Sequence, residues 1–188
     1  MKGYIYKLYA GADPSMGWEF NDPIFGKYAT LGACMPNIRR FLDIGDWVFA
    51  LSGKVPERVP YVIGGFKVDE KLDALDAYER FPEYRLKKNE RGQVIGNIIV
   101  NADGEHNALD DHDQFAKRRQ NYLVGKEAVA IVGERAIELA RARTHGMLER
   151  ILKVRSNNTA DLVPRWRGLN EEQVKALVQE LRRLQGGK

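Results

Sequence analysis

Two apolar stretches, DWVFAL at residues 46–51 and YVIGGFKV at residues 61–68, decide the fold that the sequence predicts. Each is a short run rich in β-branched and aromatic residues, and the connector between them contains Pro56 and Pro60. Runs of this length and composition, bounded by turn residues, are typical of strands. We therefore expect the two stretches to pair as antiparallel strands.

Further strands are expected on both sides of this pair. Residues 2–9 alternate, with Tyr4, Tyr6 and Leu8 on one face, which is the period of a strand. Residues 94–100 form another apolar run, and residues 122–132 read as two short strands separated by Gly125, although their Ala and Glu content also suits a helix. Residues 10–26 hold several Gly, Pro, Asn and Asp residues and predict a long loop.

Short helices are predicted between these strands. One begins at Pro36, since proline is favoured in the first turn of a helix. Others are expected around residues 72–78 and 147–154. Residues 80–93 are strongly charged and predict a surface excursion anchored by Phe81 and Tyr84.

The last helix has the clearest local signals. Asn170 and Gln173 have the spacing of a capping box. An apolar stripe with helical spacing follows, made of Val174, Leu177, Val178, Leu181 and Leu184, and Gly186 ends the helix. We expect the stripe to dock on the domain, with a second subunit or partner protein as the alternative. The chain thus divides into a domain at residues 1–155 and a linker plus helix at residues 156–188.

Composition and charge limit the classes of function. The 188 residues suffice for one buried core, and the single cysteine, Cys34, excludes an intramolecular disulfide and a multi-thiolate zinc site. We expect no signal peptide, no membrane span and a cytoplasmic location. Residues 141–188 carry 11 Lys and Arg against 5 Asp and Glu, whereas the rest of the chain is slightly acidic. Such a basic segment suits a polyanion or is a solvated helical surface.

One motif carries a family resemblance. The chain reads NDPIFGKYATLGACMPNIRR at residues 21–40 and then GDWV at residues 45–48. These residues resemble the nucleotide-modification-associated domain 2 family, which has a tyrosine-rich first strand, an Asn-Pro-Phe-like loop, a Thr-Leu-Ala-x-Cys-Lys-Pro-x-Ile-Arg run and Gly-Asp-Trp. Ala29 stands where the family often has a first cysteine, and Met35 replaces the lysine. The resemblance extends over residues 2–140 and loosens after the first third.

A more distant likeness is to the EVE and ASCH branches of the PUA-like barrels, in which a helix leads to Gly-Asp and a strand with a glycine pair returns. Gly45-Asp46 and Gly64-Gly65 are similar to those features. We therefore predict an α+β domain built on a bent mixed sheet or a small PUA-like barrel, with short peripheral helices and a C-terminal amphipathic helix. The resemblance implies a bacterial or phage protein that handles nucleic acid or a nucleotide.

A pocket that reads an extruded base needs aromatic walls, polar groups for the base edge and cations for phosphates. Candidate walls are Trp18, Phe25, Tyr28 and Trp47, each of which core packing would also explain. Thr30 and Asn97 are candidates for the base edge, or for a turn. Candidate cations for nucleotide or phosphate are Arg39, Arg40, Lys117, Arg118, Arg119, Arg165 and Arg167.

Cys34 is the sharpest catalytic candidate because it directly precedes a predicted helix start, where backbone N–H groups lower the pKa of a thiol. His106 or His112 is then the candidate base. The alternative is a buried cysteine that acts as a small hydrophobe. The acidic run that contains Asp110, Asp111 and Asp113 matches no metal signature, and we expect no metal and no cofactor.

These observations predict the recognition of a modified base or nucleotide in DNA or RNA, within a DNA-modification or phage-defence system. The first alternative is an enzyme that acts on a base or nucleotide through Cys34 and a histidine. The second is an interaction module that recruits a partner through its C-terminal helix.

Overall fold

The computed structural model describes residues 1–17 and 21–187, which form two compact units. Unit 1 contains residues 1–17, 46–67 and 127–187. Unit 2 contains residues 21–45 and 68–126. The chain therefore passes between the units more than once, and each unit is assembled from separate stretches of sequence.

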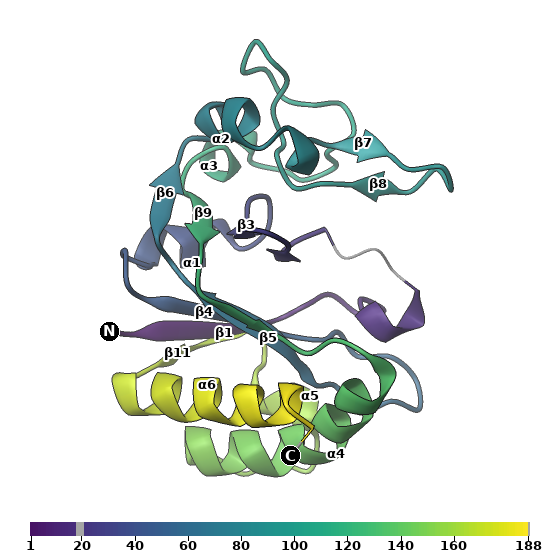
Figure 1. Cartoon of the computed structure of the whole chain (residues 1–188), viewed down its shortest axis with the longest axis vertical. Coiled ribbons are helices and arrows are strands. Elements are labelled where there is room, and N and C mark those ends of the chain that lie inside the picture. The colour runs from purple at the N-terminus through teal and green to yellow at the C-terminus, as the bar shows by residue number, and fades with distance from the viewer. Residues whose placement is uncertain (18–20, 188) are drawn as a thin grey trace. The chain divides into compact units, whose positions relative to one another are not determined.

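Unit 1 is built on a five-stranded mixed sheet in the order β10-β5-β4-β1-β11 (Figure 1). Its strands are β1 (Gly3–Lys7), β4 (Trp47–Leu51), β5 (Val62–Lys67), β10 (Ala128–Ala130) and β11 (Trp166–Leu169). β1 and β4 are parallel, whereas the other neighbours are antiparallel. The predicted antiparallel pair of strands is confirmed as β4 and β5.

Two long helices, α4 (Glu134–Leu152) and α6 (Glu171–Gln185), pack against each other and cover one face of this sheet (Figure 1). Unit 1 also contains the short helices η1 (Pro14–Met16) and α5 (Thr159–Leu162). The predicted capping box of α6 is present, because Asn170 accepts from the Gln173 amide and the Gln173 side chain accepts from the Asn170 amide. The apolar stripe of α6 is buried within the unit.

Close packing in the sheet of unit 1 requires glycine at position 65. Gly65 lies directly opposite Phe49 on the neighbouring strand. A Cβ at residue 65 would come within 2.2 Å of the Phe49 ring and 2.7 Å of the Val48 carbonyl oxygen. The missing side chain therefore makes room for Phe49, whose ring stacks on Trp47 at a centroid distance of 5.5 Å.

Unit 2 contains a four-stranded antiparallel sheet in the order β2-β3-β9-β6 and a separate two-stranded ribbon. The sheet consists of β2 (Ile24–Phe25), β3 (Ala29–Leu31), β6 (Glu70–Leu72) and β9 (Tyr122–Gly125), and the ribbon of β7 (Lys87–Lys88) and β8 (Val94–Ile95). Its helices are α1 (Pro36–Phe41), α2 (Ala74–Arg80), η2 (Pro82–Tyr84) and α3 (Phe115–Arg118).

An aromatic cluster forms the core of unit 2. The ring of Phe81 stacks on Tyr84 and on Tyr122, and the ring of Tyr28 packs against it at 5.4 Å. Ala77 and Ile98 are buried in the same cluster. Phe81 and Tyr84 thus anchor the charged segment that follows α2, as the sequence predicts.

The α+β class, the mixed sheet and the C-terminal amphipathic helix are confirmed, while three local expectations are wrong. The helix predicted at residues 147–154 begins at Glu134. The buried residues in the first part of this helix are Ala140 and Thr144. Because these side chains are small or polar, the apolar periodicity of the sequence does not reveal the start. The strand predicted at residues 94–100 is interrupted by Gly96, whose φ of 93° departs from a strand.

The third error concerns residues 156–168, which were expected to be a linker and contain α5 and most of β11. β11 is an edge strand with Leu169 as its one buried residue, so it lacks the alternating pattern from which a strand is predicted. The domain boundary at residue 155 stays a prediction. Among the described residues, no helix combines the length and the apolar character needed to cross a membrane.

The packing at Gly65 generates a stability prediction. Gly65→Ala should lower the free energy of unfolding by about 1–3 kcal/mol, because the added methyl group overpacks Phe49. Gly146→Ala is the matched control, since a Cβ there meets no atom within 4 Å inside α4 and should raise stability by about 0.5–1 kcal/mol. Urea unfolding of both variants checks this, and equal midpoints for Gly65→Ala and wild type would contradict it.

Candidate functional site

The carboxylate of Asp22 occupies a nest of backbone amides just before α1. Its Oδ1 accepts from the amide of Gly32 at 2.8 Å, and its Oδ2 accepts from the amides of Ala33 at 2.9 Å and of Cys34. Successive N–H groups of this kind form a concave site for an anion. Here the chain's own carboxylate fills that site and fixes the backbone that bears Cys34.

Asn97 extends this network into the core. Its Nδ2 donates to Oδ1 of Asp22 at 3.0 Å and to Oγ1 of Thr30 at 2.9 Å, and its Oδ1 accepts from the Tyr122 hydroxyl at 2.7 Å. Asn97 and Thr30 are buried, with 1% and 0% exposure. Both N–H donors of the Asn97 amide therefore serve the protein itself, and a contact of Thr30 or Asn97 with a base edge stays a prediction.

Arg39 is buried in the same unit, at 0% exposure. Its guanidinium donates to the carbonyls of Ala33, Cys34, Arg118, Gln120 and Asn121. Burial lowers the pKa of Arg39 to about 10, while the charge of Asp22 opposes that shift. The expectation that Arg39 contacts nucleotide or phosphate conflicts with this geometry, because all of its donors serve the protein backbone.

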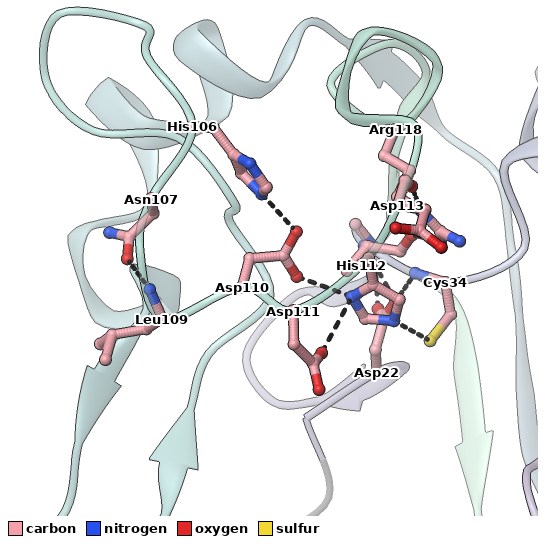
Figure 2. A network of polar contacts seen from close by, with 12 residues as sticks. Asp22, Cys34, His106, Asn107, Leu109, Asp110, Asp111, His112, Asp113 and Arg118 are labelled. Carbon is pink, nitrogen blue, oxygen red and sulfur yellow. Dashed lines mark hydrogen bonds and ion pairs between the residues drawn. The ribbon is translucent and has the colours of Figure 1, made fainter.

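Cys34, His112 and Asp110 form a chain of polar contacts that we call the Cys34 relay (Figure 2). The Cys34 Sγ lies 3.8 Å from Nε2 of His112, and the other ring nitrogen, Nδ1, lies 2.6 Å from Oδ1 of Asp110. The second oxygen of Asp110 lies 2.8 Å from Nε2 of His106. The structure therefore brings together all three catalytic candidates from the sequence, with His112 rather than His106 facing the thiol.

The environment of the relay gives each group a different accessibility. The Asp110 side chain is only 4% exposed, whereas that of His112 is 33% exposed. The ring of His106 stacks on Phe115 at 4.5 Å, which holds this second partner of Asp110 in place. A buried carboxylate thus sits behind a histidine that solvent reaches.

The pKa values of Cys34, His112 and Asp110 are shifted by their surroundings. Burial, and then the charge of Asp22, raises the pKa of Cys34. The hydrogen bond that His112 donates to Asp110 raises the pKa of His112. Burial would raise the pKa of Asp110, yet its hydrogen bonds with His112 and His106 outweigh burial and lower it. Cys34 is therefore held as a thiol, beside an imidazole whose basicity Asp110 increases.

This order of groups defines what the relay can do chemically. The contact with Asp110 favours a proton on Nδ1 of His112, which leaves Nε2 as the proton acceptor toward Cys34. Asp110 then stabilises the imidazolium that forms when the thiol proton is transferred. Nucleophile, base and orienting carboxylate are the parts of a nucleophilic active site.

The other basic candidates differ in their surroundings. Arg40 is exposed at the end of α1, and Lys117 is exposed with its ammonium on the Gln114 side chain. Arg118 donates to the carbonyls of Asp113 and Ala33, and Arg119 pairs with Asp73. Arg165 and Arg167 belong to unit 1, and the aromatic ring between them, Trp166, packs on Tyr4.

Among the described residues, the expected aromatic walls belong to both units, and their role in a site stays a prediction. Phe25 is partly exposed on β2, and Tyr28 packs on Phe81 in the core of unit 2. Trp47 is buried in unit 1 at 4% exposure. Trp18 lies outside the described residues.

Ligand atoms of Asp110, Asp111 and His112 lie within 4.8 Å of one another. Asp111 is exposed and each oxygen of Asp110 already faces an imidazole, so these groups are arranged for hydrogen bonding with one another. The absence of a metal and of a cofactor stays a prediction.

Sequence reasoning missed the residues that organise the site. Asp22 and Tyr122 contact partners 10 to 75 residues away, and neither belongs to a motif with a known chemical role. In the sequence, Asp110 stands out only as part of an acidic run. Its position two residues before His112 is the one local signal that could have marked it.

A family model for nucleotide modification associated domain 2 matches residues 15–129. The match covers more than half of the chain and includes the Asp22 nest and the Cys34 relay. The chain belongs to this family. No curated protein matches it. The membership places this nucleotide-modification-associated domain among proteins of nucleotide-modification systems, and the resemblance seen in residues 21–48 is confirmed.

The relay predicts how His112 titrates. Its pKa should lie above the ordinary value of 6.5, and Asp110→Asn should bring it down because the carboxylate partner is lost. NMR titration of the imidazole measures both values, with His145→Asn as a control for assignment and fold.

The same linkage sets a pH dependence of stability. The pKa of His112 is higher in the folded than in the unfolded protein. His112 therefore stabilises the fold fully below its unfolded pKa, and this stabilisation is lost as the pH rises through its folded pKa. The pKa of Asp110 is lowered in the folded protein, so its stabilising effect is lost as the pH falls through its folded pKa.

In the NMR titration, an unchanged His112 pKa in Asp110→Asn would show that the pair does not interact.

Proposed function

We propose that this domain carries out thiol-dependent chemistry on the base of a nucleotide, with Cys34 as the nucleophile. The observation that carries the proposal is the alignment of Cys34 Sγ, both ring nitrogens of His112 and Asp110 within hydrogen-bond reach of one another. Family membership supports a nucleotide or nucleic acid as the class of substrate. The finer expectation, a place in a DNA-modification or phage-defence system, is part of the proposal.

The raised pKa of Cys34 means that a base must remove the thiol proton before Cys34 can react. A buried thiol is a weak nucleophile until a base removes its proton. His112 Nε2 is placed to take that proton, and Asp110 offsets the positive charge that results. Cys34 therefore depends on His112, and His112 depends on Asp110.

A pyrimidine is the base best suited to this nucleophile, because its C6 is conjugated with a carbonyl or imine that accepts charge. The Cys34 sulfur forms a bond to C6 as the C5–C6 double bond opens. Its electron pair moves toward C5 and the O4 or N4 group, and the thiol proton passes to His112. Return of that proton to C5 completes the addition of S–H across the double bond, and the reverse steps release the base.

Recognition of a modified base or nucleotide without chemistry is the second proposal. Exposed Arg40 and Lys117, both in unit 2, favour it because cations on the surface can contact the phosphates of DNA or RNA. In this case Cys34 would be a half-buried wall of the site rather than a nucleophile.

A fluorinated pyrimidine distinguishes the two proposals, because fluorine at C5 withdraws electrons from the ring and favours addition of the thiol at C6. Intact-protein mass spectrometry after incubation with 5-fluoro-2′-deoxyuridine monophosphate, or with a single-stranded oligonucleotide that contains 5-fluoro-2′-deoxycytidine, should show one covalent adduct. Cys34→Ser should abolish the adduct. His112→Asn should slow its formation by about 10²–10⁴-fold, the range of a lost general base.

His145→Asn is the matched control, since His145 lies in unit 1 and should leave adduct formation unchanged. EDTA should also have no effect, because the mechanism uses no metal. Binding of the oligonucleotide with no adduct would replace the enzyme proposal by the recognition proposal. Neither binding nor adduct would contradict both.

A further inference from the structure

The strands β7 and β8 of unit 2 form a short ribbon that extends away from α2 and α3 and ends in a turn at residues 89–93 (Figure 1). Lys87 pairs with Ile95 across this ribbon, and Lys88 pairs with Val94. The Cys34 relay lies in the same unit but shares no residue with the ribbon. We call residues 85–96 the basic ribbon.

The positive charge of unit 2 is concentrated on the basic ribbon. The ribbon contains 4 Lys and Arg against 1 Glu, whereas the rest of described unit 2 contains 9 Lys and Arg against 13 Asp and Glu. Lys87, Lys88 and Arg91 are exposed, and none of them has a carboxylate partner among residues 1–17 and 21–187. A polyanion would supply the negative charge that these three side chains lack.

The turn of the basic ribbon is fixed by Asn89. Its Oδ1 accepts from the amides of Arg91 and Gln93, each at 2.9 Å, and its Nδ2 donates to Oε1 of Gln93 at 3.1 Å. The amide of Gly92 donates to the Asn89 carbonyl at 2.9 Å. These bonds hold the backbone that bears Arg91 at the end of the ribbon.

The other end of the basic ribbon is tied to the core of unit 2. Nε of Arg85 donates to the carbonyl of Tyr78 at 2.8 Å, and the Arg85 guanidinium lies 3.9 Å from the centre of the Tyr78 ring. The amide of Asn97 donates to the carbonyl of Tyr84 at 3.0 Å. The ribbon is therefore a fixed projection with a preformed shape, and its cations need little ordering when they bind a partner.

The two lysines of β7 lie on opposite faces of the basic ribbon, because neighbouring residues of a strand project to opposite sides. The major groove of B-DNA is about 12 Å wide, admits a two-stranded ribbon and is walled by two phosphate backbones. If the turn enters first, Lys87 faces one wall, Lys88 faces the other, and Arg91 faces the base edges. The planar fork of an arginine matches the O6 and N7 acceptors of guanine.

We propose that the basic ribbon binds the major groove of double-stranded DNA, with Lys87 and Lys88 on the phosphates of the two strands and Arg91 on a base edge. The major groove of an RNA duplex is deep and narrow, so it does not admit the ribbon. The inference rests on the proposed function for the class of ligand, nucleic acid, and names its form: a duplex from which the target base is extruded.

Fluorescence anisotropy with a short labelled DNA duplex, measured at several salt concentrations, tests this inference on the full chain. Lys87→Gln combined with Lys88→Gln should lower the affinity at least about tenfold at low salt. It should also reduce the slope of log affinity against log salt concentration by about 2, because each phosphate contact contributes about 0.9 to that slope. Arg91→Gln should weaken binding to duplexes that contain guanine more than to duplexes of A·T pairs alone.

Lys54→Gln combined with Arg58→Gln is the matched control, since it removes the same number of charges from exposed positions in unit 1. It should keep the affinity and the salt slope of wild type, and circular dichroism should show that both double variants are folded. A single strand of the same sequence and the corresponding RNA duplex should bind more weakly than the DNA duplex. Equal duplex affinity of wild type and the Lys87 and Lys88 double variant, or tighter binding of the single strand or the RNA duplex, would overturn the proposal.

Failure of this inference and failure of the chemistry at Cys34 give different results. Affinity for an unmodified duplex is measured without any reaction of the thiol, and the adduct with 5-fluoro-2′-deoxyuridine monophosphate is measured without a duplex. An adduct without duplex binding would contradict the ribbon alone. Duplex binding that depends on Lys87 and Lys88, without an adduct, would contradict the chemistry alone.

Discussion

The buried carboxylate of Asp22 is the constraint on which the site in unit 2 depends. A carboxylate without donors is costly in a protein interior, and Asp22 offsets part of that cost by accepting from three successive amides and from Asn97. Burial nevertheless raises the pKa of Asp22 above its ordinary value. Arg39 donates to the carbonyls of Ala33 and Cys34 in the same segment. Residues 32–34 are therefore held by Asp22 at their N–H groups and by Arg39 at their C=O groups. Cys34 consequently has a fixed backbone rather than the freedom of an ordinary loop.

The second half of the relay is tied to this segment by a cation. Arg118 donates to the carbonyl of Asp113 at 2.7 Å and to that of Ala33 at 2.7 Å, which joins the loop of His112 to the loop of Cys34. Asp110, held between His106 and His112, then sets the direction of the imidazole. The basic residues that seemed free for phosphate at the level of sequence therefore divide into structural ones, such as Arg39 and Arg118, and exposed ones, such as Arg40 and Lys117.

Local patterns in the sequence identified the elements whose stability is local. The capping box of α6, its apolar stripe and the strands at 46–51 and 61–68 are all encoded within a few residues. The first half of α4 and the edge strand β11 are polar and depend on tertiary packing, so periodicity could not reveal them. Cys34 and the histidines could be chosen from residue chemistry, but the choice of His112 depends on Asp22, Arg39 and Arg118, whose partners lie far away in sequence.

Amide hydrogen exchange of Gly32, Ala33 and Cys34, compared between wild type and Asp22→Asn, tests the central claim most directly. Asparagine offers one acceptor oxygen in place of two and presents N–H donors to the nest, so at least one amide loses its partner. Exchange should be slow in wild type and at least about tenfold faster in Asp22→Asn, the equivalent of about 1.4 kcal/mol. Asp103→Asn, in an exposed turn, should leave these amides protected. Unchanged protection of all three amides in Asp22→Asn would contradict the account.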